Sequence, residues 1–161
     1  MFSIKKFKYE KLFFIIGFFS VLIGYFLNEN SSGGAQQDFI FHYEIVKEFK
    51  NNFLFSLTNY DTFGTNHSPI FIILLLFLKI ILVNDSLVRF FHIVLFSTIP
   101  LIFFKCLKEK FHQVSERKLF IFSTIIFLSP NFRSLLIWPG SEIISIFFLT
   151  ISIYYFLKFE L

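Results

Sequence analysis

Residues 70–83 read IFIILLLFLKIILV, an apolar run that only Lys79 interrupts. Its apolar positions follow neither the two-residue period of a strand nor the 3.6-residue period of an amphipathic helix, so no polar face is left to meet water. The same pattern recurs between charged ends along the rest of the chain. Four further apolar blocks occupy residues 12–27, 90–104, 119–128 and 143–157. These blocks predict helices whose solvent is lipid.

Composition excludes a soluble domain. The 161 residues are 55% hydrophobic and 22% aromatic, with 29 Phe, and their mean hydropathy is +0.70. A soluble domain carries only about 45–50% apolar residues. We therefore predict an all-α, polytopic membrane helical bundle that forms one domain over residues 1–161. Its helices are expected near residues 12–27, 69–84, 87–107, 119–129 and 141–158.

Each apolar block is shorter than the ~20 residues that a spanning helix needs. Tilt, a thinner bilayer and snorkelling flanks such as Lys79, Arg89 and Lys105 lengthen the reach of such helices. The block at residues 119–128 is the weakest, because Ser129-Pro130 stops it. It predicts a short span, a broken helix or a re-entrant segment, and the last two need a cover of protein or of a wet cavity.

Four lysines between residues 5 and 11 precede the first block. By the positive-inside rule they keep the N-terminus in the cytoplasm, which predicts a multi-pass protein of the plasma or inner membrane. A cleaved secretory signal is the alternative, since Ser32-Gly33-Gly34-Ala35 offers small residues after the apolar run. The net charge of +4 is mostly flank charge without a basic stripe, so no nucleic-acid partner is expected. The single Cys106 can form neither an internal disulfide nor a metal motif.

A conflict of sidedness follows from these spans. If the first four blocks all cross from a cytoplasmic N-terminus, the basic segment 105–118 lies outside, against the positive-inside rule. With four crossings from a cytoplasmic N-terminus, Arg133 and Glu142 lie on the cytoplasmic side. Either one block does not cross completely, or the basic segment is an exception.

The first polar interval, residues 28–68, is the predicted external loop, and it is too long for a simple connection. Within residues 38–49, Phe41, Ile45 and Phe49 recur four apart, which predicts an amphipathic helix lying flat on the membrane. Asp38 lies near its start, where an acid is favoured, and His42 follows one turn later on the same side. In the ordinary interpretation Asp38 is a helix N-cap and His42 an interfacial side chain.

His67 immediately precedes the second apolar block, in Asn66-His67-Ser68-Pro69. A histidine before a helix that starts with proline lies at the water interface, where it can carry or relay a proton near neutral pH. The site hypothesis therefore joins His67 to Asp38 and His42 of the same loop.

The order of these parts resembles the start of the GT-C superfamily of membrane glycosyltransferases, which includes protein mannosyltransferases and aminoarabinose transferases. Members begin with one span and a first external loop that carries an acidic residue. The loop ends in a His-Pro-Pro-Leu-type sequence, where this chain has His67-Ser68-Pro69-Ile70. The later family segments are matched by Ser86-Leu87-Val88-Arg89-Phe90, Leu128-Ser129-Pro130-Asn131-Phe132-Arg133 and Trp138-Pro139-Gly140-Ser141-Glu142. Ser68 replaces the first proline of the family motif, and family members are several times longer, so the resemblance makes this chain an N-terminal portion.

The resemblance implies transfer of a sugar from a polyprenyl-phosphate donor to a cell-envelope glycan, lipid or protein. It makes Asp38 the catalytic carboxylate, which accepts the proton of the acceptor or holds a divalent cation. His67 is the second catalytic residue, and His42, Arg133 and Glu142 are assigned to substrate, with positive charge serving the leaving phosphate. For Arg133 and Glu142 the structural alternative is an ion pair that anchors a helix end.

Two other functional classes remain open. A small non-enzymatic accessory or assembly subunit of the membrane is the first, and the short chain favours it. A transporter or flippase component is the second, but it predicts ionisable side chains at mid-span. Only Lys79 and His92 meet that description within the apolar blocks.

Overall fold

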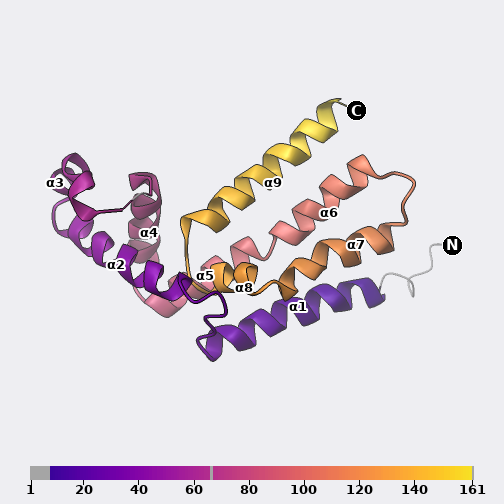
Figure 1. Ribbon diagram of the computed structural model, residues 1–161, viewed down its shortest axis with the longest axis horizontal. Helices are drawn as coiled ribbons and strands as arrows, with labels where there is room; N and C mark the ends of the chain where they lie inside the picture. Colours follow the sequence, from indigo (N-terminus) through magenta and orange to yellow (C-terminus); the bar gives the residue numbers. More distant parts are fainter. Residues whose placement is uncertain (1–7, 66, 161) are drawn as a thin grey trace.

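The computed structural model describes residues 8–65 and 67–160, and 82% of this part of the chain is helical, with no strand within it. Figure 1 shows the helices in chain order. Their bounds are α1 Lys8–Phe26, α2 Ala35–Asn51, α3 Phe53–Thr58, η1 Tyr60–Phe63, α4 Pro69–Leu82, α5 Asp85–Phe96, α6 Ile99–Lys110, α7 Glu116–Thr124, η2 Ile125–Leu128, α8 Pro130–Ile137 and α9 Ser141–Glu160. The all-α prediction is confirmed.

Two of the described helical segments are long and apolar enough to cross a membrane. One is the continuous stretch Asp85–Lys110, which contains α5 and α6, and the other is Ser141–Phe159 of α9. A third crossing results if the bent pair Glu116–Leu128 and Pro130–Ile137 forms one span. The apolar part of α1 and the whole of α4 are shorter.

The weak block at residues 119–128 ends in a break. The helix axis bends by 71° between the segments on either side of Ser129. Pro130, which has no backbone N–H to donate, begins α8, and the Ser129 hydroxyl caps α8 by accepting from the Phe132 amide at 3.4 Å. The break matches two of the alternatives for this block, a broken helix and a re-entrant segment.

The main core lies where α1, α5, α8 and α9 meet the start of α2. Its buried side chains are almost all large and apolar, and they come from both ends of the sequence. They are Val21, Phe39, Tyr43, Ile93, Phe96, Ile99, Phe127, Phe132, Leu136, Ile137, Trp138 and Ile143. This core fixes α8 and the start of α9 against α2.

A second core joins α2 to α4. We call residues 35–82, which contain α2, α3, η1 and α4, the platform; it lies beyond one end of α1, α6 and α7 (Figure 1). Its core comprises Ile45, Val46, Phe49, Phe71, Ile72, Leu75 and Leu76. α2 starts at Ala35, three residues earlier than predicted, and its buried face is rotated: Phe41 is 44% exposed, whereas His42 is 2% exposed. The rotation arises because α4 and α8 both pack against α2.

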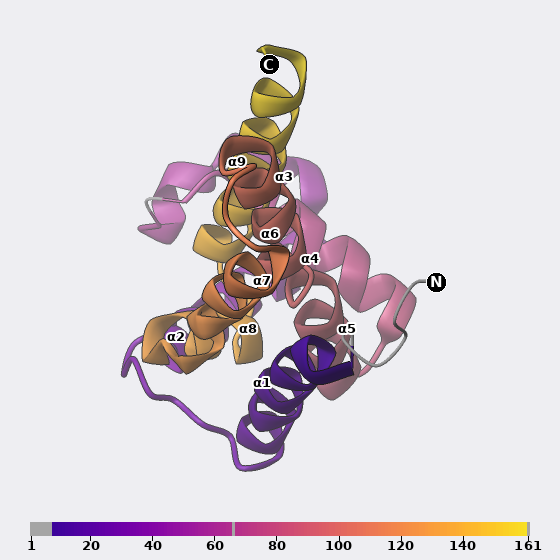
Figure 2. The same cartoon turned by 90° about the vertical axis from the view of Figure 1, so that its right-hand side faces the viewer.

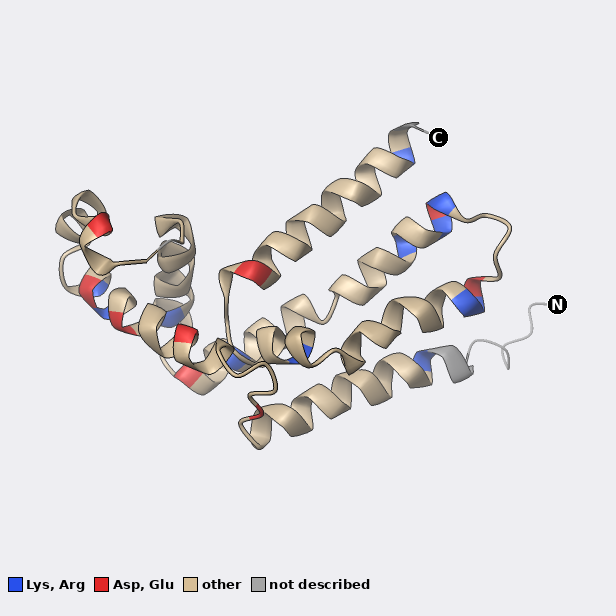
Figure 3. Ribbon diagram, viewed as in Figure 1, with Lys and Arg blue, Asp and Glu red and all other residues tan. Residues whose placement is uncertain are grey.

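Basic residues gather at the opposite end of the molecule. The start of α1, the end of α6 and the start of α7 all lie there, with their lysines and arginines drawn blue in Figure 3. We call Lys11, Lys105, Lys108, Lys110, Arg117 and Lys118 the basic end. Figure 2 looks at the molecule from this side. The other end is the platform, which carries four acids and three lysines: Asp38, Glu44, Glu48, Asp61, Lys47, Lys50 and Lys79.

Candidate functional site

Asp38 lies in the first turn of α2 as an exposed side chain. Gly34 is the N-cap residue, and the backbone amide of Asp38 donates to the Gly34 carbonyl at 3.0 Å. The N-cap interpretation of Asp38 is therefore wrong, although its place in the first turn still lets the helix dipole favour a carboxylate. The Asp38 side chain is left to face a cavity.

This cavity has a volume of about 270 Å³ and lies between the loop before α2, α8 and the start of α9. Asp38 and Glu142 both line it, so two carboxylates more than 100 residues apart in sequence face one space. Trp138 and Leu135 supply an apolar wall, and Asn131 supplies an amide. The cavity therefore combines two acids with an indole ring in its lining.

A pair of histidines lies beside the cavity. The ring centroids of His42 and His67 are 4.7 Å apart, edge to face, and His67 Nδ1 is 2.8 Å from the Ser141 hydroxyl. His42 follows Asp38 by one turn of α2, and Ser141 precedes Glu142 on α9. Asp38 and His42 are thus carried by α2 and Glu142 by α9, while His67 lies in the segment just before α4. His67 does not itself line the cavity.

His42 takes up a proton less readily than an exposed histidine. Burial lowers the pKa of its imidazole, and the charge of His67 lowers it further, while Asp38 and Glu142 act in the opposite direction. Its Nδ1 is buried without a hydrogen-bond partner among the described residues. A buried polar atom of this kind costs about 1–3 kcal/mol until a partner meets it.

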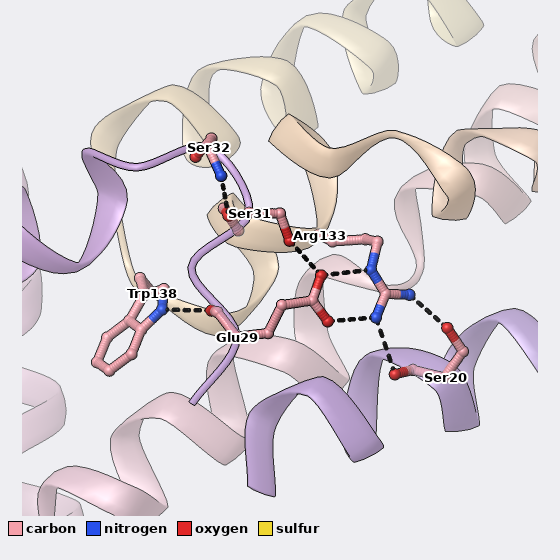
Figure 4. Close-up of polar contacts among 7 residues, drawn as sticks. Ser20, Glu29, Ser31, Ser32, Arg133 and Trp138 are labelled. Carbon is pink, nitrogen blue, oxygen red and sulfur yellow. Dashed lines mark hydrogen bonds and ion pairs between the residues drawn. The ribbon is translucent and has the colours of Figure 1, made fainter. Parts of the chain in front are cut away.

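Arg133 is bound to Glu29 and not to Glu142 (Figure 4). Its Nε donates to Glu29 Oε1 at 2.8 Å and its Nη2 to Oε2 at 2.5 Å, which makes the pair bidentate. The Ser20 hydroxyl and the Ser20 carbonyl take further N–H groups of the same guanidinium. The alternative of an Arg133–Glu142 ion pair is therefore wrong, because Arg133 pairs with Glu29, whose pKa the Arg133 hydrogen bond holds below its ordinary value.

The loop after α1 is held from two sides by α8 and the residue that follows it. The indole Nε1 of Trp138 donates to the Glu29 carbonyl at 2.8 Å, and the amide of Ser32 donates to the Ser134 hydroxyl at 3.0 Å (Figure 4). Ser31 also donates to the Glu29 carboxylate. Since Ser32 and Gly34 line the cavity, these bonds fix its wall.

Gly24 lets the ion pair approach α1. A Cβ at this position would collide with Glu29 Oε2 and would lie 3.1 Å from the Ile137 side chain and 3.2 Å from Arg133 Nη2. A methyl group at this position would force the Glu29 carboxylate to move.

Arg89 is a second buried guanidinium near the cavity, 9% exposed. It lies 3.6 Å from the centre of the Trp138 ring and 4.9 Å from that of Tyr25. Its Nε donates to the Ile137 carbonyl and its Nη1 to the Asn28 side chain, both at 3.1 Å. Stacking and neutral acceptors take the place of a counter-ion, and they hold Trp138 against the cavity.

Sequence reasoning did not find Glu29 or Trp138 as partners of Arg133 and Arg89. A glutamate directly after an apolar block, facing an arginine 104 residues later, leaves no local pattern. The one signal in the sequence was general: ionisable residues at membrane depth, such as Arg133 and Arg89, are rare and often functional.

Comparison of the chain with protein-family models, with curated proteins and with solved structures finds no match.

Proposed function

We propose that this chain carries the reaction site of a GT-C-type membrane glycosyltransferase, which moves a sugar from a polyprenyl-phosphate donor to a cell-envelope glycan, lipid or protein. The observation that supports this most is the meeting of Asp38 and Glu142 in one cavity beside His42 and His67. These are residues that the family resemblance assigns to the site.

The charge distribution supports an external site. By the positive-inside rule the basic end faces the cytoplasm, so the platform faces the other side. α4 is 14 residues and hence about 21 Å long, short of the ~30 Å hydrocarbon core, and it packs on α2. If α4 stays with the platform, then α1, α5 with α6, α7 with α8, and α9 make the crossings. The basic segment 105–118 is then cytoplasmic, and Asp38 and Glu142 are both external, which removes the conflict of sidedness.

In this reaction the Asp38 carboxylate takes the proton from the acceptor hydroxyl or amine as the acceptor attacks the anomeric carbon of the sugar. The bond between that carbon and the phosphate oxygen breaks, and polyprenyl phosphate leaves with the bonding electrons. General-base catalysis of this kind contributes about 10²–10⁴-fold in rate. We assign Nε2 of His67, the ring nitrogen that Ser141 does not engage, to the leaving phosphate.

Arg133 has a positioning role in this proposal. All three guanidinium nitrogens are engaged by Glu29 and Ser20, so phosphate binding would have to break a bidentate pair. Arg133 instead holds the loop that forms one wall of the cavity.

The family resemblance also allows a divalent cation. Within residues 8–65 and 67–160, no group of three or more His, Cys, Asp or Glu side chains is placed to hold a metal ion. Asp38 and Glu142 do match the one or two carboxylates with which proteins hold Mg²⁺ against a phosphate. A cation held there would neutralise phosphate charge.

Trp138 makes donor binding measurable, because it is the only tryptophan of the chain and it lines the cavity. The chain is reconstituted in nanodiscs and titrated with polyprenyl-phosphate mannose and polyprenyl-phosphate aminoarabinose. We expect a saturable change in Trp138 fluorescence with at least one donor. When an acceptor with a free hydroxyl or amine is added, we also expect release of polyprenyl phosphate, which Asp38→Asn slows at least a hundredfold while donor affinity changes less than threefold.

Asp61→Asn is the matched control, since Asp61 is an exposed platform acid that does not line the cavity. It should leave donor binding and turnover unchanged. Absence of donor binding to the wild-type chain, or full turnover by Asp38→Asn, contradicts the proposal.

A further inference from the structure

A further cavity, of about 220 Å³, lies between α4, α5 and α9, and we call it the apolar groove. Within residues 8–65 and 67–160, no charged side chain lines it, and His92 is its one polar lining residue. The His92 imidazole is already anchored, with Nδ1 2.9 Å from the Leu136 carbonyl. The other lining residues are Phe71, Leu74, Leu75, Leu78, Phe91, Leu95, Phe96, Ile144, Phe147 and Phe148.

The apolar groove is open on one side. Each of its three helices contributes a lining residue that is between 43% and 60% exposed, namely Leu74, Phe91 and Phe148. α5 and α9 belong to the two described segments that are long and apolar enough to cross a membrane. Exposed apolar side chains on such helices contact the hydrocarbon of the bilayer. A lipid chain can therefore enter the groove from the side.

The apolar groove borders the pair of histidines. The ring centroid of Phe71 is 5.1 Å from that of His42 and 6.4 Å from that of His67. On α9, Ile144 lines the groove one turn after Ser141, whose hydroxyl contacts His67. α4 and α9 thus form a common border between the groove and the histidines.

Three different environments meet at the start of α9. Glu142 lines the cavity of the candidate site together with Asp38, and we call this cavity the acidic cavity. Ser141 contacts His67. From Ile144 onward, the residues of α9 that line the groove are apolar. The pair of histidines therefore lies beside both the acidic cavity and the apolar groove.

We infer that the apolar groove holds the first isoprene units of the polyprenyl chain of the donor. This inference rests on the proposed function, which assigns the donor phosphate to Nε2 of His67. Such a donor consists of a sugar, a phosphate and an apolar chain in that order, and the acidic cavity, the histidines and the groove offer an environment for each. The groove, at about 220 Å³, exceeds the cavity of about 150 Å³ that binds benzene, so about one to two five-carbon units fit.

The chain is held by packing and by its link to the phosphate. Because the bilayer is as apolar as the groove, escape from water does not favour one over the other. An isoprenoid chain carries a methyl branch on each unit. It therefore makes more contacts between the aromatic rings of Phe71, Phe91 and Phe147 than an unbranched acyl chain does.

Photo-crosslinking of the full chain in nanodiscs tests the inference. The probe is polyprenyl phosphate with a diazirine in its first isoprene unit, because this molecule has the chain and the phosphate of every donor of the class. We expect the label on residues that line the groove. An excess of unlabelled polyprenyl phosphate should reduce it at least fivefold. The same excess of dioleoyl-phosphatidic acid, which has a phosphate but unbranched chains, should reduce it less than twofold.

Leu74→Trp fills the groove from α4 and should reduce the label at least fivefold. Ile81→Trp is the matched control, since Ile81 is an exposed aliphatic residue of the same helix that does not line the groove. It should leave the label unchanged. Circular dichroism verifies that both variants keep their helix content.

Label at the apolar cavity between α1, α7 and η2, with none in the groove, overturns the inference. Equal competition by dioleoyl-phosphatidic acid overturns it too, because the groove would then be a site for ordinary phospholipids. An equal loss of label in Ile81→Trp has the same consequence.

The fluorescence of Trp138 separates this failure from that of the proposed function. If Trp138 reports saturable donor binding while the groove takes no label, the chain lies elsewhere and the proposed function stands. If Trp138 reports no donor binding and the groove takes no label, both proposals are wrong.

Discussion

The Arg133 guanidinium and the Glu29 carboxylate form a bidentate ion pair between α8 and the loop that follows α1. Their side chains are 16% and 24% exposed, so water screens the pair weakly. The two residues are 104 positions apart in sequence. Their ion pair holds the loop that forms one wall of the cavity lined by Asp38.

A double-mutant cycle of Glu29→Gln and Arg133→Gln should give a coupling energy of about 1–2 kcal/mol in the free energy of unfolding. The exposed pair Glu44 and Lys47 is the control, with side chains 63% and 60% exposed, and should give about 0.5 kcal/mol or less. Denaturant unfolding in detergent provides the measurement. Coupling no larger than in the control would show that the Arg133 pair does not hold the loop.

Gly24→Ala should destabilise the protein by about 1–3 kcal/mol although alanine favours a helix, because the new methyl group displaces the Glu29 carboxylate. The same substitution in a Glu29→Ala background should cost much less, since only the contacts with the Ile137 side chain at 3.1 Å and with Arg133 Nη2 at 3.2 Å remain. Unfolding free energies of the four proteins test this. A cost of Gly24→Ala that is the same in both backgrounds would contradict it.

Arg89→Lys should lower the free energy of unfolding by about 1–2 kcal/mol and change the near-ultraviolet circular dichroism of Trp138, because an ammonium cannot stack between Tyr25 and Trp138. Arg117→Lys, at an exposed residue of the basic end, should stay within about 0.5 kcal/mol of the wild type. If the near-ultraviolet circular dichroism of Trp138 is unchanged in Arg89→Lys, the prediction is wrong.

Stability should fall as the pH drops from 8 to 5.5. Because burial lowers the pKa of His42 in the folded state, the unfolded chain takes up a proton near pH 6.5 that the folded chain does not bind, which favours unfolding as acidity rises. His42→Gln should reduce this slope, as measured by unfolding at each pH. Glu29 acts at lower pH. Its ion pair stabilises the folded state fully above the ordinary pKa of a glutamate, and this stabilisation is lost as the pH falls through the lowered pKa of Glu29 in the folded state. The same slope in His42→Gln would exclude His42 as its source.

The proposed topology makes opposite predictions for Asp61 and His112. In a Cys106→Ser background, a cysteine at residue 61 should react with a membrane-impermeant maleimide in intact cells, whereas one at residue 112 should react only after permeabilisation. The buried Cys106 must be removed first so that each label reports one residue. Labelling of both residues from the same side would contradict the topology.

The apolar blocks predicted an all-helical chain, because a segment that leaves water must satisfy its backbone hydrogen bonds internally. They did not show that α4 packs against α2, since the run at residues 70–83 reads as apolar on every side. The break at Ser129-Pro130 was visible because proline acts locally. α2 buries His42 and exposes Phe41 because α4 and α8 pack against that side of it. The spacing of apolar residues within α2 does not reveal the positions of these two helices.

For the candidate site, the sequence selected Asp38, His42, His67 and Glu142, and the structure brings these residues to neighbouring positions. Their roles in a reaction stay a prediction. The role of Glu29 could not be predicted, because its partner Arg133 lies 104 residues later in the sequence.

The lack of a side chain at Gly24 limits which residues related proteins can carry at neighbouring positions. A methyl group at residue 24 would push the Glu29 carboxylate out of its place against Arg133, so a change at 24 favours compensating changes at 29 and 133. We expect these three positions to vary together in related chains and to change in that order.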